Sequence, residues 1–270
     1  MVAKKKGGET YMYSVTQRIN DVKQPTGGYL NPAKLHVKKE DDGMTLHEQE
    51  NIHPSIIGLA VDYLSRYLLT ADAEKAFDIS LKGMQIAIHL KIIDEKERKN
   101  LFEPLNPALD DLTIINACKI CSFDVWYRNF RMARMAKPYT EINPDQETIE
   151  NIRIMVKRAE SFFKKYGPVL SDGFTFEHDG YSDLVTAGDG DYLTETTLWD
   201  FKVSKKKPTS KHTLQILMYW IMGQHSGKKE FENIKNIGIF NPRLNTVYQI
   251  AVTEIPASVI TEIEEYVICY

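Results

Sequence analysis

The hydrophobic pattern of this chain changes its period near Gly167, and this change constrains the fold more than any other feature. Before Gly167, apolar residues recur at three- and four-residue intervals, as in the stretch that begins at Pro54. After it, apolar and polar residues alternate or form short β-rich runs, as at Phe174-Thr-Phe176. The sequence therefore predicts an α/β protein with a mostly helical N-terminal half and a C-terminal half built around a sheet.

Capping residues and proline-containing turns divide the first half into four predicted helices. These helices cover about residues 54–68, 73–90, 111–130 and 145–166. The residues before Met44 are polar, contain glycine and lack clear periodicity, which is typical of a loosely ordered arm with one short strand at most.

Three consecutive strands are predicted after Gly167, followed by a helix, two more strands and a last helix. A tight hairpin turn is expected at Gly188-Asp-Gly190-Asp191, between the second and third strands. The predicted elements lie at about 174–176, 181–186, 196–203, 209–223, 237–240, 247–252 and 256–267. We expect a polar N-terminal arm (1–43), a helical region (44–144) and a sheet-containing core (145–270), the last two either separate or one integrated domain.

The composition is that of a globular protein. The chain has 34 basic and 37 acidic residues, a net charge of −3 and 43% hydrophobic residues, which excludes disorder for most of it. No apolar run reaches the length that a membrane span needs, and no apolar segment follows the basic start, so neither a membrane partner nor secretion is expected. Three cysteines, Cys118, Cys121 and Cys269, are too few for a disulfide framework and indicate a cytoplasmic protein.

Two carboxylates and a lysine on neighbouring predicted strands suggest a chemistry. Asp200 and Lys202 lie two residues apart on one strand and so share a face. Asp183 lies on the preceding strand across the predicted hairpin, and carboxylates on paired strands can bind a hard cation such as Mg²⁺. A lysine beside them can activate water or neutralise a phosphate oxygen. The pattern indicates metal-assisted phosphodiester hydrolysis; the alternative is a half-exposed strand whose charges pair at the surface.

Three sequence features occur here in a recognisable order. They are Gly180 shortly before Asp183, then Asp200-Phe-Lys202, then Gln215 and Tyr219 on a helix. In this order they resemble the PD-(D/E)XK nuclease superfamily, and within it the RecB-type exonuclease branch, which includes CRISPR-associated adaptation nucleases and phage exonucleases. The resemblance covers roughly residues 145–252. It implies a restriction-endonuclease-like core, a central mixed sheet flanked by helices, that acts on DNA.

The resemblance also implies a role for each residue. Asp183 and Asp200 would bind Mg²⁺ or Mn²⁺ together with the backbone carbonyl of Phe201. Lys202 would be the catalytic lysine, while the helical pair would line the cleft and contact the DNA backbone or order the lysine. The implied catalytic set is Asp183, Asp200, Lys202, Gln215 and Tyr219. Taken alone, the helical pair is better explained as a polar seam on an amphipathic helix.

Further acidic residues are less well defined by the sequence. Family members carry a helix-borne acid that also binds metal, for which Glu160 is the candidate, with Glu150 and Glu177 as alternatives. Many members have a histidine in an early helix where this chain has Asp62. This aspartate is interpreted either as a metal ligand or as a solvated or ion-paired residue.

A cluster of lysines follows the proposed catalytic strand, and we interpret it as a DNA phosphate contact. We name it the lysine cluster: Lys205, Lys206, Lys207 and Lys211. The alternative is an ordinary solvated loop. The basic start, 4–6, either assists or is a passive tail. Asp189 and Asp191 are assigned a turn role, and the Cys118/Cys121 pair is interpreted as buried thiols rather than a cluster ligand.

The sequence thus predicts a divalent-metal-dependent nuclease that hydrolyses DNA. The resemblance to the RecB-type branch implies that it acts like an exonuclease. The competing hypothesis is a catalytically silent protein of the same fold that binds nucleic acid or a protein partner. A helical interaction protein with an incidental sheet is a third possibility.

Overall fold

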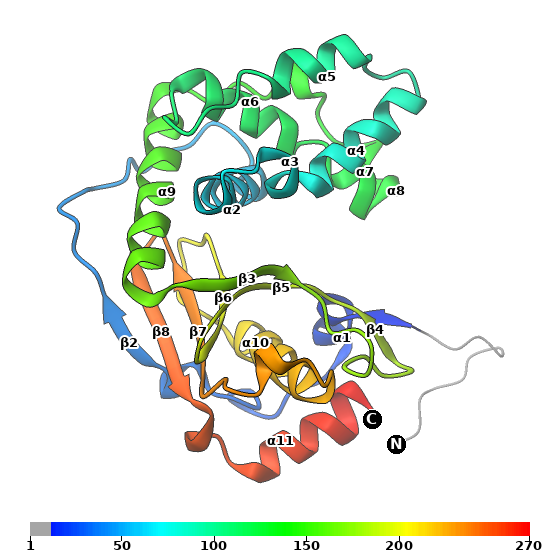
Figure 1. Ribbon diagram of the computed structural model, residues 1–270, viewed down its shortest axis with the longest axis vertical. Helices are drawn as coiled ribbons and strands as arrows, with labels where there is room; N and C mark the ends of the chain where they lie inside the picture. The colour runs from blue at the N-terminus through cyan, green and yellow to red at the C-terminus, as the bar shows by residue number, and fades with distance from the viewer. Residues whose placement is uncertain (1–11) are drawn as a thin grey trace. The chain divides into compact units, whose positions relative to one another are not determined.

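The computed structural model of the chain describes residues 12–270 and has a mixed α/β architecture. The chain divides into two compact units (Figure 1). We call them the sheet unit, which combines residues 12–40 with Phe163–Tyr270, and the helical unit, Asp41–Phe162. Helix α9 (Gln146–Tyr166) begins in the helical unit and ends in the sheet unit.

The helical unit consists of helices separated by capped turns. Asp94 and Asp110 each accept a hydrogen bond from the main-chain N–H three residues later, which satisfies a donor that the first helical turn leaves unpaired. Its elements besides α9 are α2 (Pro54–Thr70), α3 (Ala73–Ala76), α4 (Asp78–His89), α5 (Glu95–Phe102), α6 (Asp111–Cys121), α7 (Asp124–Arg128), α8 (Phe130–Ala133) and the 3-10 helix η2 (Tyr139–Glu141).

The predicted helix over 111–130 is three helices in the structure. Helix α6 ends at Cys121, and in the turn that follows both the hydroxyl (2.6 Å) and the main-chain N–H (3.2 Å) of Ser122 donate to the Lys119 carbonyl. Cys118 and Cys121 are both buried on α6, which confirms the prediction of buried thiols.

A six-stranded mixed sheet forms the centre of the sheet unit. Its strand order is β2-β8-β7-β6-β5-β3, and only the β6–β7 pair is parallel. The strands are β2 (His36–Lys39), β3 (Val169–Phe174), β5 (Gly190–Thr194), β6 (Thr197–Phe201), β7 (Asn236–Asn241) and β8 (Thr246–Ala251). A separate two-stranded parallel sheet joins β1 (Tyr13–Ser14) to β4 (Val185–Ala187).

Helices cover the sheet and complete the unit. Helix α10 (Ser210–His225) packs along β6 and β7 and also contacts α1 (Val15–Asp21), as Figure 1 shows. The core between them is aliphatic and includes Leu198, Leu217 and Ile239. The remaining elements are η1 (Pro32–Lys34), η3 (Lys229–Phe231), η4 (Val252–Glu254), α11 (Ala257–Ile263) and the π-helical turn η5 (Glu264–Ile268).

Aromatic rings pack on the opposite face of the sheet. Phe201 stacks on Phe163 with ring centroids 5.5 Å apart, and Trp199 meets Tyr166 edge-on at 5.5 Å. The ring of Trp199 lies against Gly238 of the neighbouring strand, where an added Cβ would come within 2.2 Å of it. A glycine is therefore required at this position for the aromatic layer to close.

The N-terminal segment differs from the predicted loosely ordered arm. Within 12–40 the chain forms β1, α1, η1 and β2, and β2 is the edge strand that pairs with β8. A capping box between Ser14 and Gln17 starts α1, whose Val15 and Ile19 are buried. These elements are each two to seven residues long, too short for a periodic pattern to be recognised.

The division of the chain also differs in detail from the three predicted regions. Residues 12–40 belong to the sheet unit, and the second division falls at 162/163 within α9 rather than near residue 145. The physical reason is that α9 is one continuous helix whose last turn carries Phe163 and Tyr166 into the aromatic layer. Among the described residues, no helix has the length and apolar character needed to cross a bilayer.

A buried carboxylate organises the polar interior of the helical unit. Asp124 is 3% exposed and accepts hydrogen bonds from Tyr63 Oη (2.9 Å), Ser80 Oγ (2.5 Å) and Arg128 Nε (3.1 Å). Burial raises the pKa of Asp124 above the ordinary value of 3.8, while the hydrogen bonds from Ser80, Arg128 and Tyr63 oppose that rise.

We predict that Asp124→Asn flattens the pH dependence of stability. Because the folded chain holds this proton more tightly than the unfolded chain, the stability contributed by protonation is complete below 3.8 and disappears as pH rises through the raised pKa. Urea unfolding followed by circular dichroism at several pH values from about 4 to about 7 measures this slope. Glu74→Gln, at an exposed carboxylate of the same unit, is the control. Equal slopes for Asp124→Asn and the unmodified chain would contradict the prediction.

Candidate functional site

Strand β6 positions the residues on which the sequence interpretation depends. It lies between β5, with which it is antiparallel, and β7, with which it is parallel. All five of its residues are buried. Trp199 and Phe201 face the aromatic layer, so Leu198 and Asp200 face α10, because successive side chains of a strand point to opposite faces. A carboxylate is thereby placed within the core side of a central strand.

Asp200 forms a buried ion pair with Lys202. The Lys202 Nζ lies 2.7 Å from Asp200 Oδ1, which places both side chains on the same side as the sequence predicts. Asp200 is 1% exposed, whereas the Lys202 side chain retains 23% exposure. No described residue from 12 to 270 gives the other oxygen, Asp200 Oδ2, a hydrogen bond. A buried carboxylate oxygen without a partner is costly, so this atom is suited to an additional positive ligand.

The carboxylate opposite Asp200 in the sheet is Asp191. The β5–β6 register pairs Tyr192 with Trp199 and Leu193 with Leu198, so the next pair toward the end of β6 is Asp191 with Asp200. Directly opposed residues of an antiparallel pair have side chains on the same face. Asp191 Oδ2 also accepts a hydrogen bond from the main-chain N–H of Phe201 (2.8 Å), which holds it beside the end of β6.

Sequence reasoning missed Asp191 because it placed the hairpin turn at 188–191. In the structure the turn between β5 and β6 is Glu195-Thr196, so Gly190 and Asp191 belong to a strand. The Glu-Thr pair lacks the glycine, asparagine or aspartate that normally identifies a two-residue turn. The remaining signal is the β-rich Tyr192-Leu-Thr194 run, whose alternation extends back to Asp191.

The structure places Asp183 away from the position expected of it. Asp183 is exposed in a bend before β4, and β4 pairs with β1 rather than with β6. The neighbouring Ser182 hydroxyl donates to the carbonyl of Ile268 near the C-terminus (2.5 Å). The prediction that Asp183 lies on the strand paired with the Asp200 strand is therefore wrong, since β5 occupies that place.

Gly180, the glycine of the sequence pattern, has a packing role in the structure. It is buried, and an added Cβ would lie 2.3 Å from the carbonyl oxygen of Met222 on α10 and 2.5 Å from that of Phe176. Main-chain atoms cannot retreat as a flexible side chain can, so the close approach of two backbones requires glycine here.

Gln215 and Tyr219 lie one turn apart on α10 and bond to each other. Gln215 Nε2 donates to the Tyr219 hydroxyl oxygen (2.9 Å). Tyr219 is buried; burial raises its pKa well above the usual range, and the charges of Asp200 and Asp191 raise it further. Both carboxylates therefore act on the electrostatics of this hydroxyl.

His212 is a second residue near this pair that sequence reasoning did not select. It lies in the first turn of α10, where its Nδ1 accepts a hydrogen bond from the Thr209 main-chain N–H (3.2 Å), so a neutral ring carries its proton on Nε2. Burial lowers the pKa of His212, and the charge of Lys202 lowers it further. The imidazole is thus neutral at pH 7 and near Lys202. The sequence does not indicate this placement, because a histidine after a run of lysines is typical of a solvated loop.

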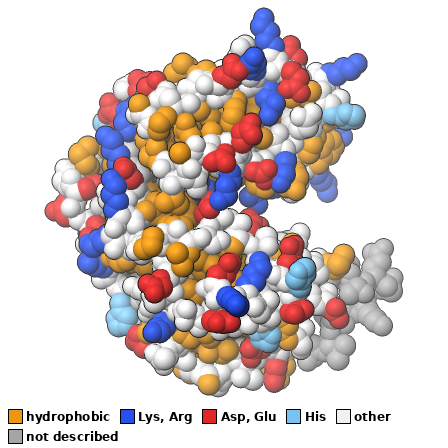
Figure 2. Space-filling view, in the orientation of Figure 1, with side chains coloured by type: hydrophobic (Ala, Val, Ile, Leu, Met, Phe, Trp, Pro, Cys, Tyr) orange, Lys and Arg blue, Asp and Glu red, His pale blue; other side chains and the backbone are white. Residues whose placement is uncertain are grey.

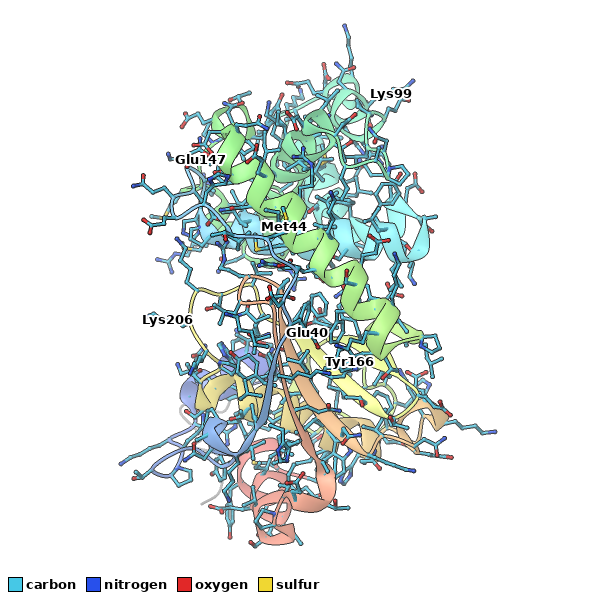
Figure 3. The ribbon with its side chains drawn as sticks, turned by 90° about the vertical axis from the view of Figure 1, so that its left-hand side faces the viewer. Glu40, Met44, Lys99, Glu147, Tyr166 and Lys206 are labelled. Carbon is cyan, nitrogen blue, oxygen red and sulfur yellow. The ribbon has the colours of Figure 1, made fainter. Side chains whose placement is uncertain are left out.

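The lysine cluster follows the site directly. Lys205, Lys206 and Lys207 are exposed on the loop between β6 and α10, which Figure 3 shows at Lys206. Lys211, in the first turn of α10, donates to Asn20 Oδ1 (2.6 Å). The Asn241 side chain braces the start of this loop by donating to the Ser204 carbonyl (2.8 Å). The loop is consequently anchored at its base, while its three lysines are exposed.

The other candidate acids have separate environments. Glu160 lies on α9 within the helical unit, whereas Asp200 lies in the sheet unit. Glu150 interacts with His47 Nε2 (2.8 Å), Glu177 is exposed after β3, and Asp62 pairs with Arg66 (3.1 Å). The ion pair of Asp62 agrees with the second of its two sequence interpretations. The basic start, 4–6, lies outside the described residues.

The site as a whole presents two adjacent carboxylates, one ammonium group and a neutral imidazole at the end of β6. No group of three or more His, Cys, Asp or Glu residues suited to a metal ion occurs within 12–270. Asp191 and Asp200 bring two carboxylates together, one fewer than such a group requires.

Comparison of the chain with models of known protein families, with curated proteins and with solved structures finds no match.

We predict strong energetic coupling between Asp200 and Lys202. Lys202→Met leaves a buried carboxylate without its ammonium partner and should lower the free energy of unfolding by about 3 kcal/mol. The double variant Asp200→Asn/Lys202→Met leaves no buried charge, so its destabilisation should be smaller than the sum of those of the two single variants. The measurement is a double-mutant cycle from urea unfolding.

The exposed pair Asp78–Lys82 (2.6 Å) is the matched control for this cycle. Its coupling should not exceed about 0.5 kcal/mol, because both groups are solvated. Equal coupling energies for the two pairs would contradict the interpretation of Asp200–Lys202 as a buried pair.

Proposed function

We propose that this protein is a divalent-metal-dependent nuclease that hydrolyses phosphodiester bonds in DNA in an exonuclease-like manner. The observation that carries the proposal is the ion pair at the end of β6, in which Asp200 Oδ1 contacts Lys202 Nζ while the buried Asp200 Oδ2 has no hydrogen bond from the described residues. The mixed sheet with its flanking helices is compatible with a restriction-endonuclease-like core, which the order of sequence features also favours.

The donor set suits Mg²⁺ or Mn²⁺. These cations prefer oxygen ligands, and Mg²⁺ commonly binds proteins through one or two carboxylates and retains several water molecules. Asp200 Oδ2 and Asp191 supply the carboxylates, and the Phe201 carbonyl is the proposed main-chain ligand. A bound cation would polarise the phosphoryl group and stabilise charge that develops on its oxygens.

The side chains around the pair have separate proposed tasks. Lys202, partly exposed, orients the attacking water or neutralises charge on a phosphate oxygen. Gln215 holds the Tyr219 hydroxyl, and Tyr219 lines the floor of the site beside Asp200. His212, neutral at pH 7 with a proton on Nε2, can donate one hydrogen bond to a phosphate oxygen.

Two carboxylates compete for the role of second metal ligand. The order of sequence features favours Asp183, whereas the strand register favours Asp191 because it lies opposite Asp200. Asp183 is exposed before β4. We propose Asp191, since a carboxylate on the adjacent strand reaches the same face as Asp200.

We predict that DNA cleavage requires Asp191 and does not require Asp183. Asp200→Asn, Lys202→Met and Asp191→Asn should each reduce DNA cleavage in Mg²⁺ or Mn²⁺ by at least about 100-fold, because each removes a charged group from the reacting phosphate. Asp183→Asn is the matched control and should retain activity within about twofold. Linear and circular, single- and double-stranded DNA are the substrates, with a chelator reaction as the blank.

The pattern of activities decides between the interpretations. An inactive Asp183→Asn variant with normal activity in Asp191→Asn would assign the second ligand to Asp183 and overturn the register argument. Cleavage absent from the unmodified chain on every substrate, with retained DNA binding, would instead favour the catalytically silent nucleic-acid-binding alternative.

We also predict that the lysine cluster contributes to DNA binding. Replacing Lys205, Lys206, Lys207 and Lys211 by Ser should weaken duplex binding and reduce the slope of log K against log salt by about 0.9 for each phosphate that a lysine no longer neutralises. Cleavage at saturating DNA should change much less, because these residues position the backbone rather than act on the scissile phosphate. Superimposable salt plots for the variant and the unmodified chain would remove the cluster from the DNA path.

A further inference from the structure

The helical unit displays large apolar side chains at its surface over α7, α8 and the turn that follows. Tyr127 is 50% exposed, Phe130 47%, Met132 51% and Met135 77%. These four residues lie within nine positions of the sequence, so the exposed apolar side chains are concentrated in one short segment. We call these residues, with the basic residues between them, the α7–α8 surface.

Basic residues alternate with these apolar side chains. The segment from Val125 to Thr140 contains four basic residues and no acidic residue, in a chain whose overall net charge is −3. Arg128 forms an ion pair with Asp124. The other three, Arg131, Arg134 and Lys137, are exposed, and no ion pair within 12–270 involves them. Figure 2 shows basic and hydrophobic side chains next to each other on this unit.

The local backbone explains why the rings remain at the surface. Asn129, with φ −155° and ψ 80°, ends α7, and its side chain accepts a hydrogen bond from the Met132 N–H to begin α8. Ala133 is the buried residue of α8. Since the small alanine provides the anchor, the large side chains of this short helix turn outward.

Contacts within the unit hold the two aromatic rings. Lys82 Nζ lies 5.6 Å from the centroid of the Tyr127 ring, a cation–π contact, and Trp126 meets Phe130 edge-on with centroids 5.8 Å apart. The rings are thus held by the fold on one side while half of each remains accessible. Rings fixed in this way lose little conformational entropy when a flat ligand stacks on them.

We propose that the α7–α8 surface binds single-stranded nucleic acid. Bases stack on Tyr127 and Phe130, and the phosphates between them contact Arg131, Arg134 and Lys137, a combination of π-faces and cations that suits an unpaired strand. A duplex offers only its phosphates, because its bases are already stacked. An anionic membrane is a poorer match, since α7 has five residues and α8 four, whereas membrane-surface binding uses a longer amphipathic helix.

This proposal does not rest on the proposed nuclease activity. The α7–α8 surface lies in the helical unit, whereas the Asp191–Asp200 pair lies in the sheet unit, and binding is measured without catalysis. Weakened binding in one set of variants and weakened cleavage in the other can therefore be distinguished.

We predict that the charge and the rings contribute separately. In chelator-containing buffer, fluorescence anisotropy with oligothymidylate measures binding by the full chain. Arg131→Gln/Arg134→Gln/Lys137→Gln should weaken binding at least tenfold and reduce the salt slope by about 0.7 for each phosphate left without its cation. Tyr127→Ser and Phe130→Ser should each weaken binding to oligothymidylate by about tenfold while leaving the affinity for a blunt duplex unchanged.

The control removes equal charge elsewhere on the same unit. Lys91→Gln/Lys96→Gln/Lys99→Gln, at exposed positions between α4 and α5 and on α5, should change affinity by less than about twofold. Equal decreases in affinity for the two triple variants would reduce the effect to net charge and overturn the proposal. So would unchanged oligothymidylate binding in folded Phe130→Ser and Tyr127→Ser, as judged by circular dichroism.

Vesicles test the other source of negative charge. The unmodified chain is mixed with phosphatidylserine vesicles and with oligothymidylate in competition. Displacement of the chain from vesicles by oligothymidylate, or no vesicle binding, supports the proposal. Binding to vesicles that depends on Phe130, with oligothymidylate binding that does not, would assign the surface to a membrane instead.

Discussion

Burial of an ionic side chain in a central strand is the constraint on which the rest of the sheet unit depends. Asp200 lies on a strand whose five residues are all buried, between the aromatic layer and α10. Its charge is tolerated because Lys202 follows at the point where the strand emerges, close enough to pair and still partly exposed. The strand must therefore end here, and the loop that follows must begin at the same point.

The neighbouring elements are arranged to suit this strand end. Asn241, at the end of the parallel neighbour β7, holds the departing loop by its Ser204 carbonyl. The polar side chains of α10 near the carboxylates need hydrogen-bond partners of their own. Gln215 and Tyr219 meet this requirement by bonding to each other. Each of these side chains thus has a bonded partner of its own within an otherwise apolar interface, and the exception is Asp200 Oδ2.

The sequence predicts the parts of this structure that depend on composition and periodicity. The change of period near Gly167 indicates helices before a sheet, and the alternation at Asp200 and Lys202 places them on one face; the structure confirms both. The candidate site is harder, because a register is set by pairing between strands. Glu195-Thr196 lacks the residues typical of a tight turn, so the sequence pattern predicts the turn at 188–191 instead. Asp191 is then assigned to that turn, and Asp183 is assigned to the strand beside Asp200, which in the structure is β5. The sequence allows one short strand in the N-terminal arm but does not locate β2, because its four exposed residues carry no apolar pattern.

The pairing of strands that lie far apart in the sequence has a consequence for how the chain folds during synthesis. The helical unit is one uninterrupted stretch, 41–162, and all its partners are available as soon as that stretch has been made. The sheet is different, since His36 of β2 pairs with Gln249 of β8 and Tyr13 of β1 with Val185 of β4. Strand β2 consequently stays unpaired until β8 has left the ribosome. All four residues of β2 are exposed, and two of them are the lysines Lys38 and Lys39. Their charge discourages the unpaired strand from pairing with another chain.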